Sequence, residues 1–152
     1  MEIRWNVYKI GFEAGGLVLF AVIMLPNFLW FAVPTPNDVL RRESITPILD
    51  MAAQCFQVLL AAALCMVKNT QAKRPMGTKF KLAVVLFVVL YYIGWAMYYA
   101  GIANAVVILD LCIAPCMAFL VFSAARKNVP AFVFAAAFMV CHVVYGVGNF
   151  LL

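Results

Sequence analysis

Charge is scarce in this sequence: charged residues make up 11% of its 152 residues, whereas hydrophobic residues make up 68%. A soluble domain is normally about half apolar and roughly a quarter charged. A soluble fold of this size could not bury that much apolar surface in its core, and the mean hydropathy is +1.04. We therefore expect an integral membrane protein, with residues 1–152 forming a single transmembrane domain.

Histidine and serine are almost absent. His142 is the one histidine, which excludes zinc motifs that need two. The two serines, Ser44 and Ser123, are expected at other depths than His142, so a serine–histidine pair is not predicted. The sequence thus implies no catalytic residue, no metal and no cofactor, and an enzyme is the less favoured class. Haem ligation by His142 is a minor alternative.

A disulfide framework is not expected, because the five cysteines are odd in number and lie within apolar runs. Cys112 and Cys116, in the stretch CIAPC, stand one helical turn apart beside Pro115. Quinone-linked disulfide enzymes have two residues between the paired cysteines, and here there are three. We interpret these thiols as small packing residues next to a proline kink.

Long apolar runs, in contrast, are abundant. A bilayer core needs roughly 20 apolar residues per helix. Five stretches meet this length: residues 10–33, 47–67, 82–100, 105–125 and 131–152. Unbroken runs such as LAVVLFVVL favour helices, since the strands of a membrane barrel alternate apolar and polar residues. The predicted fold is an all-α bundle of five transmembrane helices, with Thr46 and Asn104 as N-caps. The first run is too long for a signal peptide and is expected to be retained.

Basic residues are distributed unevenly between the two sides of these spans. Nine lie on the side of the N-terminus: Arg4, Lys9, Lys68, Lys73, Arg74, Lys79, Lys81, Arg126 and Lys127. On the other side lie Arg41 and Arg42. Cytoplasmic loops carry the excess of lysine and arginine, so we expect a cytoplasmic N-terminus and an external C-terminus. The charge indicates orientation, and no nucleic-acid-binding pattern accompanies it.

Polar and aromatic residues interrupt the apolar runs at a common depth, in the outer half of the predicted bundle. Helical spacing places most of them in stripes on single helix faces. They are Asn27 on the first span, Asp50, Gln54 and Gln57 on the second, Tyr91, Trp95 and Tyr98 on the third, Asp110 on the fourth, and His142, Tyr145 and Asn149 on the fifth. Such groups are costly in a membrane unless they face the bundle interior or a wet cavity. We predict that they line an outward-facing ligand pocket.

Asp110 draws most attention, because it lies in the otherwise apolar stretch VVILDLCIAPC. We expect Asp110 and His142 to approach each other and to act as polar anchors of the pocket. The alternative stays open that Asp110 and His142 pair with each other only to stabilise the fold. In that case the helix dipole favours Asp50, the glutamines join helices, and Trp95 belongs to an interfacial aromatic belt.

The stretches LPNFLWFAVPTPND, LYYIGWAMYY and CHVVYG resemble those of a group of small bacterial multipass membrane proteins. That resemblance implies a membrane fold and no particular activity. The span count and aromatic content are also similar to those of the translocator/tryptophan-rich sensory proteins, which bind porphyrins and sterols, as an architectural analogy. The tryptophan and double proline of that family are missing, since Trp30 is followed here by FAVPTP.

The predicted function is small-molecule binding by a sensor, a binding protein or a transporter component of the bacterial cytoplasmic membrane. The alternative is an accessory subunit whose polar layer only locks the helices together. The expected partners are the lipid bilayer, a small-molecule ligand and a second copy of the chain, joined through a small-residue face at Gly11 and Gly15. No nucleic-acid partner is predicted.

Overall fold

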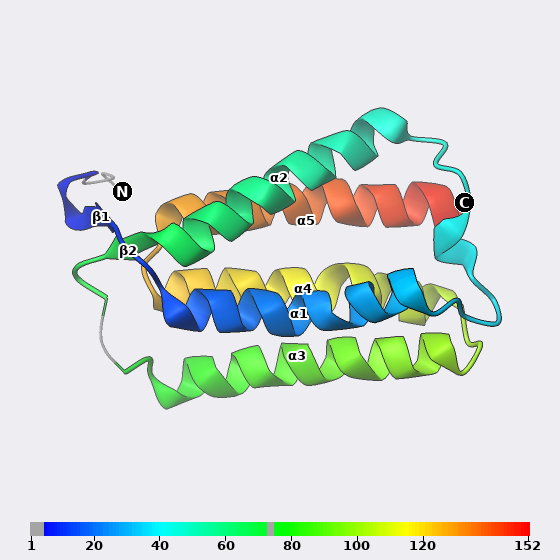
Figure 1. The fold of residues 1–152 in the computed structure, drawn as a ribbon, viewed down its shortest axis with the longest axis horizontal. Helices are drawn as coiled ribbons and strands as arrows, with labels where there is room; N and C mark the ends of the chain where they lie inside the picture. Colours follow the sequence, from blue (N-terminus) through cyan, green and yellow to red (C-terminus); the bar gives the residue numbers. More distant parts are fainter. Residues whose placement is uncertain (1–4, 73–74) are drawn as a thin grey trace.

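The structure is a computed structural model that describes residues 5–72 and 75–152 (Figure 1). Five long helices dominate it: α1 (Ala14–Ala32), α2 (Pro47–Met66), α3 (Thr78–Tyr99), α4 (Ala105–Ala125) and α5 (Val129–Phe150). All five are long and apolar enough to cross a membrane. The predicted all-α bundle is therefore confirmed, and its architecture is that of a multi-pass membrane protein.

The helix ends follow local sequence features. α2 begins at Pro47, whose fixed φ suits the first helical turn. α4 follows Asn104, whose side chain accepts a hydrogen bond from the Val107 N–H at 3.0 Å, as predicted for an N-cap. Thr46 occupies the N-cap position of α2 but makes no side-chain cap, and its hydroxyl binds Asn149 instead. Both α3 and α5 begin earlier than predicted.

Short segments outside the membrane helices complete the fold. They are the 3-10 turns η1 (Trp5–Val7) and η2 (Val39–Arg41) and the strands β1 (Tyr8–Ile10) and β2 (Val67–Asn69). The two strands pair in antiparallel fashion, with Lys9 opposite Lys68. This pairing ties the start of α1 to the end of α2. It also explains why α1 begins at Ala14 and not at residue 10, as the sequence predicted.

The glycine that allows close packing near the start of α1 is not one of the two that were predicted. Gly11 precedes the helix, where its N–H donates to the Met66 carbonyl at 2.9 Å. The expectation that Gly11 and Gly15 share one helical face is therefore wrong. The close approach is made by Gly16, which packs against the backbone carbonyl of Leu64 on α2 so tightly that a Cβ would collide with it.

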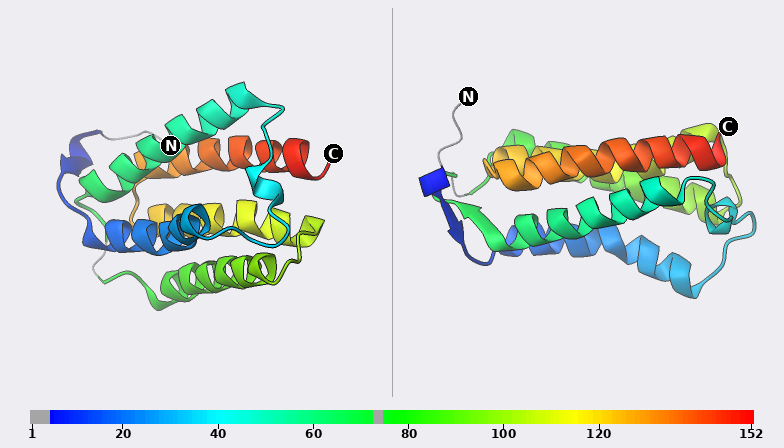
Figure 2. Two further views of the ribbon diagram at one scale, coloured as in Figure 1. Left: turned by 45° about the vertical axis from the view of Figure 1, so that its right-hand side comes forward. Right: turned by 90° about the horizontal axis from the view of Figure 1, so that it is seen from above.

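α4 is the central helix of the bundle (Figures 1 and 2). More than half of α4 is buried, against less than a quarter of each other helix. α4 packs between α3 and α5, α2 packs along α5, and α1 lies across α2, α3 and α4. The outer four helices expose large apolar side chains, such as Leu82 and Val140. Lipid is the solvent that such faces require.

The two ends of the bundle differ in charge. The end that carries the paired strands and the start of α1, here called the Arg126 end, also holds Lys9, Lys68, Lys79, Lys81 and Lys127. The opposite end, here called the Arg41 end, holds Arg41, Arg42 and the C-terminus (Figure 1). Arg4, Lys73 and Arg74 lie outside the described residues. At the Arg126 end, the Arg126 guanidinium pairs with the Glu13 carboxylate at 3.2 Å.

Candidate ligand-binding cavity

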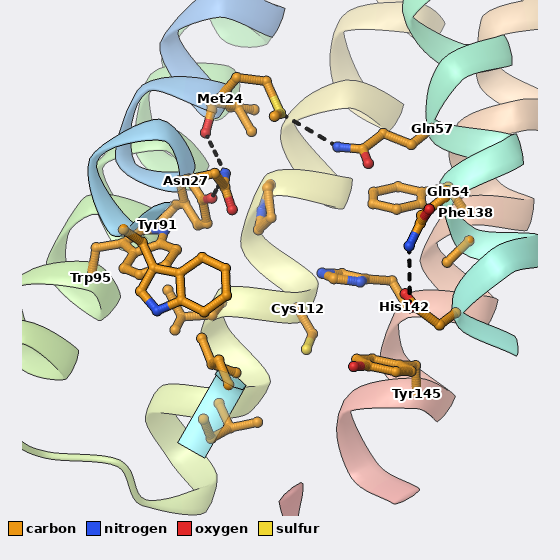
Figure 3. Close-up of a pocket in the computed structure, with 18 of the residues that line it drawn as sticks. Met24, Asn27, Gln54, Gln57, Tyr91, Trp95, Cys112, Phe138, His142 and Tyr145 are labelled. Carbon is orange, nitrogen blue, oxygen red and sulfur yellow. Dashed lines mark hydrogen bonds between the residues drawn. The ribbon is translucent and has the colours of Figure 1, made fainter. Parts of the chain in front are cut away.

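The helices enclose a cavity of about 550 Å³ (Figure 3). Its lining residues come from the half of the bundle nearer the Arg41 end. All five helices and Leu40 of the loop between α1 and α2 contribute side chains to it. Its volume falls within the range of roughly 300–1,000 Å³ that is typical of small-molecule sites. Figure 3 shows polar side chains of α2 and α5 facing aromatic side chains of α3 across this space.

One wall of the cavity is built by α2 and α5. Asp50, Gln54 and Gln57 follow at helical spacing on α2, and all three line the cavity. The Gln54 amide donates to the Asp50 carboxylate at 3.1 Å. The Gln57 amide donates to the Met24 sulfur at 3.4 Å, and thioether sulfur is a weak acceptor. These amides therefore keep hydrogen-bonding capacity for a further group.

His142 and Tyr145 extend this wall on α5. The imidazole stacks on the Phe138 ring with a centroid separation of 4.9 Å and an interplanar angle of 18°. Within the part of the chain that the structure describes, no hydrogen bond occupies either imidazole nitrogen. His142 thus presents an unused donor and an unused acceptor in the cavity.

The opposite wall is aromatic and comes from α1 and α3. The Asn27 amide donates to the Tyr91 hydroxyl at 2.7 Å and to the Ile23 carbonyl at 3.1 Å, which joins the two helices. Trp95 packs edge-on against Tyr91, with ring centroids 6.3 Å apart, and lies 6.5 Å from the Trp30 ring. Trp30 was not predicted as a cavity residue, although it lies three residues from Asn27 on the same helix, a spacing that puts both on one face.

α4 supplies the base of the cavity through Ile108, Leu111, Cys112, Pro115 and Phe119. The Cys112 sulfur fits beside Gly146 on α5, where an added Cβ would lie 2.5 Å from it. Cys116 is fully buried but does not line the cavity. Cys112, predicted only as a packing residue, therefore also forms part of the cavity wall. Among the described residues, no group of three or more His, Cys, Asp or Glu side chains could hold a metal ion.

The expected role of Asp110 needs correction. Asp110 does not line the cavity, and its carboxylate packs against Gly94 of α3, where even a Cβ would collide with Oδ2. That oxygen is buried and has no hydrogen-bond partner among the described residues. At 100° per residue, Asp110 lies about 200° around α4 from Cys112, so it faces away from the cavity. The structure therefore does not bring Asp110 to His142: His142 lines the cavity, and Asp110 packs against α3.

Two other predicted residues lie beyond the cavity, at the Arg41 end. The Asn149 side chain accepts from the Ile45 N–H at 2.7 Å and donates to the Thr46 hydroxyl at 2.6 Å. The Tyr98 hydroxyl accepts from the Leu40 N–H at 3.1 Å. Both residues sit in the last turn of their helices, where the α1–α2 loop offers backbone partners. They hold this loop in place and do not line the cavity.

Tyr98 also belongs to a cluster that the sequence analysis missed, formed by Trp30, Asp38, Arg41 and Tyr98 and here called the Asp38 cluster. The Trp30 indole and the Tyr98 hydroxyl donate to Asp38 Oδ1 at 2.8 and 3.0 Å, and Arg41 Nε lies 2.6 Å from Oδ2. Arg41 also stacks over the Trp30 ring, 4.7 Å from its centroid. Because Trp30 and Leu40 line the cavity, this cluster sets the position of one cavity wall.

The charge of Asp38 is stabilised within this cluster. Burial alone would raise the pKa of the Asp38 carboxyl, but hydrogen bonds from Trp30, Arg41 and Tyr98 outweigh it and hold this pKa below the usual 3.8. Asp38 is therefore an anion that organises three donors from two helices and the loop between α1 and α2.

These features define the class of this molecule: a multi-pass helical membrane protein with a polar and aromatic cavity between its five helices. Comparisons with models of protein families, with curated proteins and with solved structures gave no match.

Proposed function

We propose that the protein binds a small organic molecule in this cavity, as a sensor, a binding protein or a component of a transporter in the bacterial cytoplasmic membrane. The observation that carries the proposal is the cavity of about 550 Å³ whose polar side chains stay incompletely paired. His142 and the carbonyl oxygens of Gln54 and Gln57 contribute hydrogen-bonding capacity that no described residue uses.

The energetic cost of incompletely paired polar side chains supports a ligand site over a polar layer that only joins the helices. Polar side chains at membrane depth are costly unless they pair with one another or line a wet cavity, so a purely structural polar layer would pair its members across the helices. Asn27 with Tyr91 and Asn149 with Thr46 are paired in that way and fit the structural alternative. The α2–α5 wall is not paired in that way, because its amides and imidazole face open space.

The distribution of charge supports access from the external side. The Arg126 end carries most of the basic residues and would face the cytoplasm by the positive-inside rule. The cavity lies nearer the Arg41 end, so this orientation would put it in the outer half of the bilayer. A molecule arriving from the outer leaflet or from the external solution would reach it there.

The proposal is tested by filling the cavity. Ala53 is a nearly buried cavity residue of α2, whereas Val58 of the same helix is 69% exposed on the lipid-facing side. Ala53→Phe should occlude the cavity, and Val58→Phe adds the same side chain outside it. Binding of three aromatic probes of similar shape would be measured by equilibrium dialysis: tetraphenylphosphonium, triphenylphosphine oxide and tetraphenylborate.

We expect at least one probe to bind the wild-type protein and the Val58→Phe variant alike, with an affinity reduced at least about tenfold by Ala53→Phe. Probe uptake that is equal in all three proteins would reflect partition into detergent, and it would contradict a ligand site in the cavity. The melting temperature of each variant verifies that it is folded.

A further inference from the structure

We infer that the ligand of this cavity is an organic cation with an aromatic or apolar body, and that the carboxylate of Asp50 is its counter-charge. This inference rests on the proposed function and specifies the chemical class of its ligand. It follows from the charges that line the cavity, from the faces of its aromatic rings and from the partners of Asp50.

The cavity has a negatively charged group and lacks a fixed positive one. Among its described lining residues, Asp50 is the one carboxylate, and neither lysine nor arginine occurs. An intramembrane carboxylate is costly unless a cation or a set of donors compensates it. The hydrogen-bond donor to Asp50 is the neutral amide of Gln54. The charge of Asp50 is therefore only partly compensated by the protein.

The arginines at this end of the bundle do not line the cavity. Arg41 pairs with Asp38 and donates to the Trp30 carbonyl. Arg42 lines a separate shallow pocket next to Asn37 and Asp38. The titratable groups that share the cavity with Asp50 are His142 and Tyr145 on α5, Tyr91 on α3 and Cys112 on α4, and none carries a permanent positive charge. A cationic ligand would supply the missing charge.

The opposite wall favours the same class of ligand. Trp30, Tyr91 and Trp95 line the cavity across from α2 and α5, as Figure 3 shows for Tyr91 and Trp95. The face of an aromatic ring carries partial negative charge, which attracts cations and repels anions. Tryptophan is the strongest of the aromatic side chains in this respect. A cation with an apolar body would thus contact an aromatic wall on one side and Asp50 on the other.

A competing explanation for Asp50 is that the dipole of α2 stabilises its charge, since Asp50 is the fourth residue of that helix. In that case the cavity would show no preference for the charge of its ligand. Tetraphenylphosphonium and tetraphenylborate have nearly the same shape and opposite charges, so their relative affinity separates the two explanations.

The decisive experiment is equilibrium dialysis of both ions against the wild-type protein, Asp50→Asn and Asp110→Asn. Asp50→Asn keeps the size of the side chain and an acceptor for Gln54. Asp110→Asn removes an intramembrane carboxylate that faces away from the cavity, so it is the matched control. We expect wild-type protein to bind tetraphenylphosphonium at least about tenfold more tightly than tetraphenylborate, and Asp50→Asn to abolish most of that preference. Asp110→Asn should change it less than about twofold.

Equal binding of the two ions by the wild-type protein, or tighter binding of tetraphenylborate, would overturn the inference without the use of any variant. So would an Asp50→Asn protein that is folded and retains the full preference. Neither result affects the proposed function as long as Ala53→Phe still abolishes the binding of one probe. Loss of the inference and loss of the proposed function are therefore distinguishable.

Discussion

Replacing Asp38 by asparagine should destabilise the Arg41 end of the bundle at neutral pH. Asparagine retains the shape of the side chain but loses its charge. Its NH2 group is a donor, so it cannot accept from all three donors that converge on Asp38. The Asp38–Arg41 ion pair contributes about 0–1 kcal/mol, because the Arg41 side chain is 40% exposed. The hydrogen bonds that Trp30 and Tyr98 donate become weaker in the variant, which adds about 1 kcal/mol to the loss of stability. The expected loss is about 1–2 kcal/mol, or about 3–6 °C in melting temperature.

The pH dependence of this loss has a definite sign. The pKa of Asp38 is lower in the folded protein than its usual 3.8, so its ionisation stabilises the fold fully above pH 3.8. The contribution disappears as the pH falls through the lowered pKa. The difference in melting temperature between wild type and Asp38→Asn should therefore be largest at pH 7 and should shrink at pH 3.

Thermal unfolding followed by tryptophan fluorescence measures both effects, with Glu43→Gln as the control. Glu43 is an exposed carboxylate in the same loop, so its neutralisation should change the melting temperature by less than about 1 °C. An unchanged melting temperature for Asp38→Asn at pH 7 would refute the reasoning. So would a difference from wild type that grows on acidification.

Three further substitutions test the packing around the cavity. Gly94→Ala should destabilise the protein by about 1–3 kcal/mol, because the added Cβ collides with the Asp110 carboxylate. In a double-mutant cycle of melting temperatures, Asp110→Ala should restore much of that lost stability. Asn128→Ala should lower the free energy of unfolding by about 2–3 kcal/mol, because Asn128 caps α5 and donates to the carbonyls of Ala63 and Val67. A loss below about 0.5 kcal/mol in thermal unfolding would contradict this role. Joint replacement of Cys112 and Cys116 by alanine should leave the fold nearly intact in thermal unfolding. A disulfide-dependent activity lost in this variant would contradict their interpretation as packing residues.

The membrane helices were predictable because lipid selects for one simple property, a run of apolar residues about as long as the bilayer is thick. Pro47 and Asn104 added local end signals, and the helices begin there. The strands β1 and β2 were not predictable in the same way. They are three residues long and far apart in the chain, and no periodicity marks such short segments.

The depth of the polar residues in the bundle was predictable from the sequence. The direction in which each one faces from its helix was predictable for some of them only. Residues of α2 and α5 that follow at steps of three or four, such as Gln54 and His142, do line one space. Asp110 had no polar neighbour at helical spacing on α4, so depth alone assigned it to the pocket, and it faces α3 instead. Tyr98 and Asn149 continue their stripes into the final helical turns, where loop backbone replaces the cavity as their partner.

The Asp38 cluster escaped prediction because its partners come from a loop and two helices. The spacing of Asp38 and Arg41 indicates a local ion pair. It does not indicate that Trp30 and Tyr98, which is 60 residues away, donate to the same carboxylate. Only the packing of α1 against α3 brings these donors together.

The central claim, that the cavity holds a small organic molecule, is tested most directly by photochemical labelling. Photoreactive aryl azides of tetraphenylphosphonium and of triphenylphosphine oxide would each be activated on the protein in lipid vesicles, and the adducts of whichever probe binds would be mapped by mass spectrometry. The account predicts adducts on cavity residues such as Trp30, Gln54 and His142, and their loss in Ala53→Phe. Adducts confined to lipid-facing residues such as Val58 and Val140, and equal in both proteins, would contradict it.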